Sequence, residues 1–247
     1  MTQNTKAATS RLLSLDVLRG ITIAGMIMVN NPGSWGSIYA PLGHAEWNGL
    51  TPTDLVFPFF MFIMGVSMFL SYKKFEFKFS GRTFTKLLRR SVLLFLIGLG
   101  IGWFSLFLRG LRSEELIGLP VFERILQAAN NFENIRILGV LQRLALVSFF
   151  GSLIVLLFKP KHIPWIIGFI LVAYWAIIYL SGSMELSSNS LIAIIDRNIL
   201  GEAHMYTSHL ADGSAIAFDP EGILSTLPCI ARSEERRVGK ECLRLCR

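Results

Sequence analysis

Long apolar runs alternate with short polar stretches along most of the chain. Runs of about 18 or more apolar residues are typical of transmembrane helices, because a helix needs about 20 residues to cross a bilayer. The pattern predicts five complete spans, which are Leu12–Asn31, Leu55–Tyr72, Ser91–Leu108, Ile135–Phe158 and Ile163–Ser181. A sixth run begins near Ile223. We therefore predict an all-α fold, a polytopic transmembrane helical bundle with five complete spans and the start of a sixth.

Lysine and arginine residues are concentrated in alternate loops. Seven of them lie in the loop Tyr72–Arg90, and others lie before the first span and at Lys159 and Lys161. The loops on the other side carry fewer. Because positive charge favours the cytoplasmic side of a membrane, we predict a cytoplasmic N-terminus. The loops Pro32–Thr53 and Gly182–Gly222 then face outward.

Composition supports a membrane protein. The chain has 247 residues, of which 52% are hydrophobic and 17% are charged, whereas a soluble domain carries about 25% charged residues. We attribute the formal net charge of +7 mostly to the basic loops that indicate the topology. These loops suit contact with anionic membrane lipid. No nucleic-acid-binding module is recognisable, so a nucleic-acid partner is not expected.

The chain changes character at Arg232. The stretch RSEERRVGKE resembles a translated sequencing adapter and interrupts what would be the sixth span. We therefore expect a cytoplasmic tail over residues 1–10, a partial membrane domain over 11–231, and a foreign tail over 232–247, so that the chain is the front part of a longer protein. Cys242 and Cys246 lie in that tail, and the cysteines indicate neither a metal site nor a disulfide framework.

Ionisable residues inside the predicted spans are candidates for function, because they are costly in lipid. Asp16 and Arg19 share one face of the first span, where they form a structural ion pair or serve a functional role. Gln142 and Arg143 indicate a buried polar pocket that could hold a phosphate or a carboxylate. We expect Arg136, one heptad earlier, on the same face as Arg143.

The stretch GHAEWNGLTPTDLVFPFF leads into the second span. Asp54 suits the first turn of that helix, and Trp47 suits the aromatic belt at a membrane surface. His44 lies in the outward loop, where it is either a solvated residue or a base or nucleophile. Asn30 ends the first span, and its position alone favours a helix-terminal role.

Two neighbouring segments, RLLSLDVLRGITIAGMIMVNNPG and HAEWNGLTPTDLVFPFFMFIMG, resemble the catalytic domain of the heparan-α-glucosaminide N-acetyltransferase family, which includes bacterial NagX-like relatives. Three further segments resemble it in the same order: LLRRSVLLFLIGL at Leu87–Leu99, ILGVLQRLALV at Ile137–Val147 and FDPEGILSTLP at Phe218–Pro228. The resemblance covers most of Arg11–Ala231, and the motif around His44 is its most specific part.

This resemblance implies transfer of an acetyl group from cytoplasmic acetyl-CoA, as co-substrate, to the amine of a terminal glucosamine or a related amino sugar on the outer side. It implies that His44 is the base or a transient acetyl carrier, and that Asn30 takes part in catalysis. An asparagine amide could donate a hydrogen bond to the oxyanion that develops on the acetyl carbonyl. No metal is implied.

The remaining roles are assigned from charge and position. Arg143, Gln142 and Arg90 are candidates for binding the phosphates of coenzyme A. Candidates for binding the amino sugar lie in the outward loops: Trp47, Asn48, Asp54, Asp219 and Glu221. Asp219 and Glu221 are equally explained by the helix dipole at the start of the sixth span. We assign Asp16 and Arg19 a structural or gating role.

Two other functions compete with a membrane acyltransferase of the bacterial inner membrane. A solute transporter would use Asp16, Arg19 and Arg143 to line a pathway, and it would take up solute without acetyl-CoA. A non-enzymatic membrane partner protein would show no biochemical change on His44→Ala. The pattern leaves a homo-oligomer open.

Overall fold

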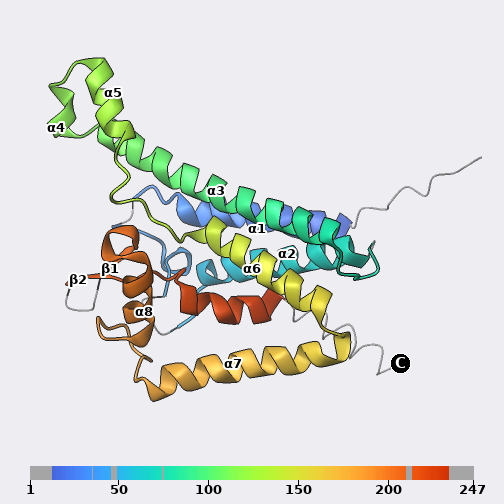
Figure 1. Cartoon of the computed structure of the whole chain (residues 1–247). Coiled ribbons are helices and arrows are strands. Elements are labelled where there is room, and N and C mark those ends of the chain that lie inside the picture. Colours follow the sequence, from blue (N-terminus) through green and yellow to red (C-terminus); the bar gives the residue numbers. More distant parts are fainter. Residues whose placement is uncertain (1–12, 35, 46–48, 74, 210–212, 234–247) are drawn as a thin grey trace, which may run out of the picture. The chain divides into compact units, whose positions relative to one another are not determined.

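The computed structural model describes residues 13–34, 36–45, 49–73, 75–209 and 213–233 (Figure 1). The chain divides into two compact units, Met1–Ser67 and Met68–Arg247. Five helices in the described residues are long and apolar enough to cross a membrane: Leu13–Asn30, Thr53–Lys73, Gly81–Leu111, Val140–Leu157 and Pro160–Leu180. The predicted all-α polytopic fold is therefore confirmed.

The first unit contains helix α1, Leu13–Asn30, two short 3-10 turns, Ala40–Leu42 and Thr53–Leu55, and the start of helix α2, Val56–Lys73. The bounds of α1 and α2 agree with the predicted spans to within one residue. Beyond the end of α1, the Asn31 side chain donates a hydrogen bond to the Ile27 carbonyl at 2.8 Å. That contact satisfies a carbonyl at the helix end, where Pro32 prevents further helix.

Helix α3, Gly81–Leu111, begins well before the predicted Ser91. Ser80 caps it, because the Ser80 hydroxyl accepts a hydrogen bond from the Thr83 amide at 3.2 Å. An N-cap of this kind stabilises the first turn of a helix. No Pro lies between Ser80 and Pro120, so the helix can continue. Arg90 and the other basic residues after Ser80 therefore lie on exposed positions of α3 and not in a loop.

Helix α6, Val140–Leu157, begins later than the predicted Ile135. The Ile137 amide donates to the His204 carbonyl at 3.1 Å, and the ring Nδ1 of His204 lies 2.8 Å from the Ile135 carbonyl. These bonds hold the segment outside the helix, because its backbone is already paired. The expectation that Arg136 shares a helix face with Arg143 is therefore wrong.

Helices α3 and α6 pack antiparallel. Phe84 contacts Phe149 with ring centroids 6.1 Å apart, and the Ser91 and Ser148 hydroxyls lie 3.5 Å apart. A Cβ atom at Gly98 would lie 2.6 Å from Oε1 of Gln142. Gly98 thus lets the two helices approach closely where Gln142 is buried.

A short helical pair that the apolar pattern did not predict follows α3. It consists of helix α4, Glu114–Ile117, and helix α5, Val121–Ala129. The Trp103 indole donates to the Ala129 carbonyl at 3.0 Å and ties α5 back to α3. The 3-10 turn Pro160–His162 then leads into helix α7, Ile163–Leu180, which agrees with the fifth predicted span.

The loop after α7 is more ordered than its polar composition indicated. It contains helix α8, Leu191–Leu200, the 3-10 turn Glu202–His204 and a hairpin of strands β1, Thr207–His209, and β2, Ala215–Ala217. The strands are antiparallel, with Ser208 opposite Ile216. Ile192, Ala193 and Phe218 form a small core beneath them.

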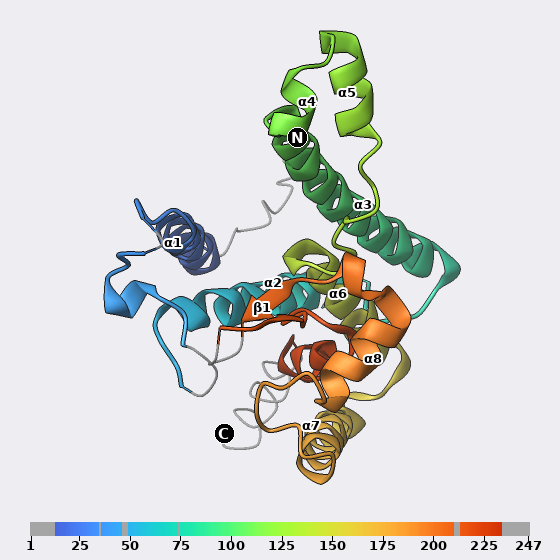
Figure 2. The same ribbon diagram turned by 90° about the vertical axis from the view of Figure 1, so that its left-hand side faces the viewer.

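The chain then enters a helix over residues 223–233, which begins where the sixth run was predicted. Arg232 and Ser233 continue this helix, and residues 234–247 of the predicted foreign tail lie outside the described residues. In Figure 2, α7 and the 223–233 helix are seen nearly end-on, with α8 beside them.

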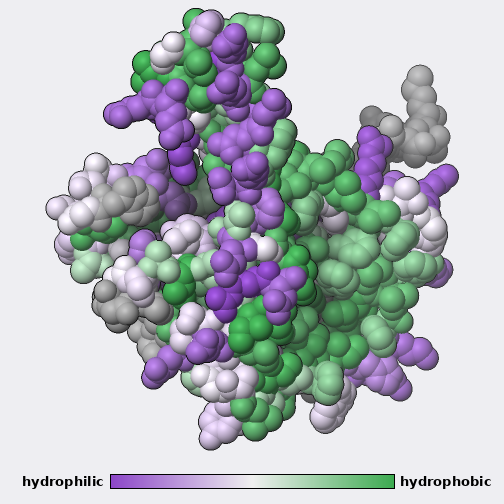
Figure 3. Space-filling model, turned by 60° about the vertical axis from the view of Figure 1, so that its left-hand side comes forward, coloured by the Kyte–Doolittle hydropathy of each residue, from purple (hydrophilic) through white to green (hydrophobic). Residues whose placement is uncertain are grey.

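Large apolar side chains cover much of the surface. Trp165, Phe169 and Val172 of α7 are exposed, as are many residues of α3. Figure 3 shows a broad hydrophobic area on one face. Soluble monomers rarely expose apolar patches beyond a few hundred Å², so this surface suits contact with lipid.

Candidate functional site

His44 and Asp54 form a pair at the entrance of α2. Nδ1 of His44 lies 2.7 Å from Oδ1 of Asp54. The other oxygen of Asp54 accepts hydrogen bonds from the Ala45 amide at 3.2 Å, the Thr51 amide at 2.9 Å and the Thr51 hydroxyl at 2.9 Å. These bonds fix the carboxylate, so that Asp54 holds the histidine in one orientation.

The His44 side chain is more accessible to solvent than the Asp54 side chain. The His44 side chain is 66% exposed, whereas that of Asp54 is 23% exposed. An ionised carboxylate only accepts hydrogen bonds, so Nδ1 of His44 carries the proton and Nε2 is left as an acceptor. A histidine that is held in place by a carboxylate can act as the base that activates a nucleophile in acyl transfer.

The sequence contained a signal for this carboxylate. Thr51 and Asp54 follow the capping-box pattern, in which an acid three residues on turns back towards the start of a helix. The pairing with His44 was not foreseen. Asp54 therefore positions His44 in this structure, and its predicted role in binding sugar stays a prediction.

Apart from Asp54, Asn30 is the one residue predicted to act near His44 that the structure describes. Asn30 is the last residue of α1 and is exposed. Among the described residues, no hydrogen bond joins Asn30 to His44. Trp47 and Asn48 lie outside the described residues.

Asp16 and Arg19 form the predicted pair on α1, with Nη1 of Arg19 3.4 Å from Oδ1 of Asp16. Nη2 of Arg19 also donates to the Ser67 hydroxyl on α2 at 3.0 Å. The arginine thereby connects α1 to α2, and the structural or gating role of the pair stays a prediction.

A second polar cluster surrounds Asp219. Arg136 binds Asp219 through Nε at 2.9 Å and Nη2 at 2.6 Å, and Nη2 also contacts Glu221. Asp219 is completely buried. The Tyr206 ring lies against the guanidinium, 5.1 Å from its centroid. Burial alone would lower the pKa of Arg136, but its hydrogen bonds and charge contacts with Asp219 and Glu221 outweigh that effect and raise it.

Arg143 joins α6 to the same turn. It is buried and donates to the carbonyl of Pro220 at 3.0 Å and to the carbonyl of Ser225. Gln142, also buried, packs against Gly98 and Gly139. Arg90 lies on the exposed surface of α3. No contact in the structure tests the predicted binding of coenzyme A phosphates by these residues.

Asp196 was missed by the sequence analysis, although it is the only acid in the segment LIAIIDRNIL. It is completely buried, and its Oδ1 accepts a hydrogen bond from the Ile223 amide at 2.9 Å. Its Oδ2 has no hydrogen-bond partner in the described part of the chain. Burial is the main cause that raises the pKa of Asp196 to about 6. The carboxyl group of α8 thus anchors the start of the 223–233 helix.

Gly222→Ala tests that anchor. A Cβ atom at position 222 would lie 2.7 Å from Cγ of Asp196, so the buried carboxyl would have to move and lose its bond to Ile223. We expect a loss of roughly 1–3 kcal/mol in stability, measured as a lower unfolding temperature of the protein in detergent. Gly168→Ala in α7 is the control, because nothing lies within 4 Å of its added Cβ. Equal unfolding temperatures for the two variants would contradict the close contact.

No group of three or more His, Cys, Asp or Glu residues that could hold a metal ion occurs within the described ranges.

The described part of the chain has five helices able to cross a membrane, with a histidine–carboxylate pair ahead of one of them, which defines a polytopic membrane protein with a candidate acid–base site. No family model matches the chain. It is 30% identical to heparan-alpha-glucosaminide N-acetyltransferase of Homo sapiens over 89% of its length, and 28% identical to that of Mus musculus over 91%. These two matches support the heparan-alpha-glucosaminide N-acetyltransferase family for this chain. It spans 36% of the human and 38% of the mouse protein.

Proposed function

We propose that the protein is a multi-pass membrane acetyltransferase. It moves an acetyl group from cytoplasmic acetyl-CoA to the amine of a terminal glucosamine, or a related amino sugar, on the outer side of a bacterial inner membrane. The observation that carries the proposal is the His44–Asp54 pair, an oriented base in a chain related to named N-acetyltransferases.

The pair supplies what acetyl transfer to an amine needs. The amine nitrogen attacks the thioester carbonyl, the new N–C bond forms, and the C–S bond breaks to release the thiol. The attacking nitrogen must lose a proton, which Nε2 of His44 accepts. Such general base catalysis typically contributes 10²–10⁴-fold. Asp54 stabilises the imidazolium that forms, since its carboxylate lies 2.7 Å from Nδ1.

The same geometry serves a two-step route. In that route Nε2 attacks the thioester first and carries the acetyl group to the amine. Both routes need Nδ1 protonated and bound to Asp54, so the structure supports the residue role equally in each. Asn30 is proposed as a hydrogen-bond donor to the oxyanion, and Trp47 and Asn48 as sugar-binding residues.

The predicted topology limits which arginines could bind the phosphates of coenzyme A. With the N-terminus in the cytoplasm, α3 starts on the cytoplasmic side and α6 on the outer side. Arg90 lies nine residues after Gly81, about 14 Å along α3, whereas Arg143 is in the first turn of α6. Arg90 is therefore the better candidate for a cytoplasmic phosphate. Arg143 and Gln142 would lie towards the outer end, beside Asp219 and Glu221.

The test uses sealed membrane vesicles that contain the protein expressed from its complete gene. Acetyl-CoA labelled in the acetyl group is supplied on the cytoplasmic face and glucosamine on the other. We expect labelled N-acetylglucosamine on the glucosamine side, and none when N-acetylglucosamine, which has no free amine, replaces the acceptor. Glucosamine uptake that needs no acetyl-CoA, with no labelled product, would favour a transporter and overturn the proposal.

A further inference from the structure

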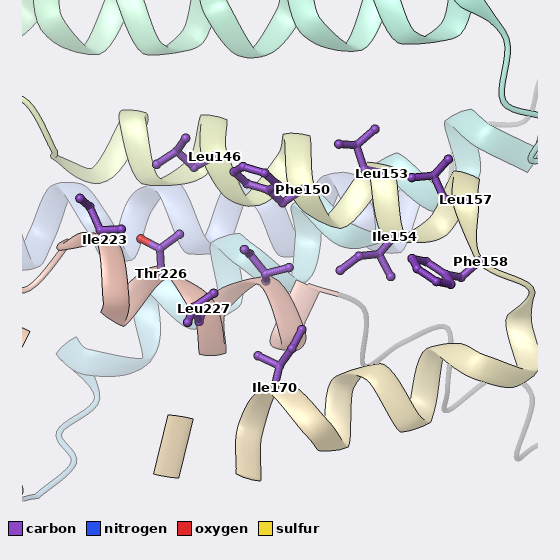
Figure 4. A pocket seen from close by; sticks show the side chains of 11 residues that line it. Leu146, Phe150, Leu153, Ile154, Leu157, Phe158, Ile170, Ile223, Thr226 and Leu227 are labelled. Atoms are coloured by element: carbon purple, nitrogen blue, oxygen red, sulfur yellow. The ribbon is translucent and has the colours of Figure 1, made fainter. Parts of the chain in front are cut away.

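An apolar cavity lies within the second unit. It has a volume of about 430 Å³ and is lined by residues of α6, α7 and the 223–233 helix (Figure 4). Cavities of this size hold small ligands. Thr226 carries the one side-chain oxygen of the lining, and that hydroxyl already donates to the Gly222 carbonyl at 2.7 Å.

The cavity follows one face of α6. Its lining residues on this helix are Leu146, Phe150, Leu153, Ile154 and Leu157, and Phe158 follows directly after the helix. They recur at the spacing of a helical stripe. From Leu146 to Phe158 the stripe extends about 18 Å at 1.5 Å per residue. One leaflet of a bilayer core is about 15 Å deep, half of the roughly 30 Å total. The cavity therefore matches the length of acyl chain in one leaflet.

The cavity is closed on one side and charged at one end. Ile163 and Ile167 of α7 pack against Ala231 of the 223–233 helix and close the gap between these helices. Lys159, Lys161 and His162 follow Phe158 directly and are exposed. Neither lysine makes an ion pair with any residue that the structure describes.

The same end carries the marks of a membrane surface. Exposed Trp165 lies at the start of α7, next to these basic residues. Tryptophan and lysine near the ends of spans are typical of the interface between hydrocarbon and water. A ligand there would place an apolar chain between the helices and an anionic group at the lysines.

We propose that α6, α7 and the 223–233 helix form a binding site for an anionic membrane phospholipid. One acyl chain fills the cavity from Phe158 towards Leu146, and the phosphate lies at Lys159 and Lys161. This site is independent of the proposed acetyl transfer, since it uses neither His44 nor Asp54.

The test reconstitutes the purified full chain in vesicles of equal parts phosphatidylglycerol and phosphatidylcholine, with a trace of phosphatidylglycerol that carries a photoreactive group near the end of one acyl chain. After illumination, labelled peptides are identified by mass spectrometry. We expect labelling concentrated near Leu146 and Ile170. Added unlabelled phosphatidylglycerol competes, and phosphatidylcholine competes less.

Two pairs of variants separate the cavity from the surrounding lipid. Leu153→Trp fills the cavity and is expected to lower labelling there about tenfold, whereas Leu93→Trp, on the exposed face of α3, leaves it unchanged. Lys159→Ala and Lys161→Ala each lower the preference for phosphatidylglycerol about fivefold. Arg82→Ala and Arg89→Ala, on α3, do not change that preference.

The wild-type labelling pattern decides the question even if a variant fails to fold. Labelling spread evenly over the exposed faces of α3 and α7 would show ordinary surrounding lipid and overturn the site. Equal competition by the two lipids would overturn the headgroup assignment. Cross-links to a second protein chain would show that the cavity is a helix–helix interface.

Discussion

His44→Ala is expected to reduce acetyl transfer to glucosamine by at least about 10²–10⁴-fold, the usual contribution of a positioned base. The variant removes the imidazole whose Nε2 is proposed to take the amine proton. The loss should appear in kcat rather than KM, since the base acts on the reacting atoms and not on substrate affinity. The measurement is formation of labelled N-acetylglucosamine by vesicles with matched amounts of protein.

Asp54→Asn refines this expectation. The amide keeps the size of the side chain but loses the negative charge that stabilises the imidazolium, so we expect at least about a tenfold loss in kcat. Thr51→Ala removes one hydrogen bond to Oδ2 of Asp54 and should cost much less. Glu76→Gln is the control for charge, because Glu76 is exposed and pairs only with Lys78 among the described residues.

Two results would contradict the pair as catalytic machinery. Full activity of His44→Ala would show that the histidine is a loop residue. Inactive His44→Ala combined with fully active Asp54→Asn would leave His44 in place and reduce Asp54 to a structural role.

The spans could be predicted because a transmembrane helix depends on local composition. The apolar runs that form α1, α2 and α7 end at polar or Pro residues, so their predicted bounds lie close to those in the structure. The starts of α3 and α6 were not, since they depend on a cap at Ser80 and on backbone pairing of Ile137 with His204. Neither contact can be recognised from the hydropathy of the sequence.

The site was predictable to a similar degree. His44 could be singled out by its motif, and the capping-box pattern marks Asp54, but only the folded loop places them 2.7 Å apart. The partners Arg136 and Asp219 are separated by 83 residues, and no local pattern joins them. Asp196 was missed for the same reason, since its role depends on the Ile223 amide 27 residues away.

The Arg136–Asp219 contact carries the largest expected effect on stability. Asp219→Ala would leave Arg136, whose side chain is only 31% exposed, with Glu221 as its remaining acid. Removing one partner of a buried ion pair costs about 3–5 kcal/mol, because the other charge stays desolvated. We expect a markedly lower unfolding temperature in detergent, and loss of the turn that Arg143 holds at Pro220.

A matched control and a rescue make this prediction specific. Glu202→Gln removes an acid that lies 4.0 Å from Arg197 and is 73% exposed, so it should change stability by less than about 1 kcal/mol. Combining Arg136→Leu with Asp219→Leu and Glu221→Gln removes all three charges of the cluster, and an apolar replacement of a whole buried ion pair is often neutral. The triple variant should therefore be more stable than Asp219→Ala. If Asp219→Ala and Glu202→Gln unfold at the same temperature, the buried pair does not hold the Asp219 turn to the segment before α6, and Asp219 is available for the sugar-binding role that its charge suggested.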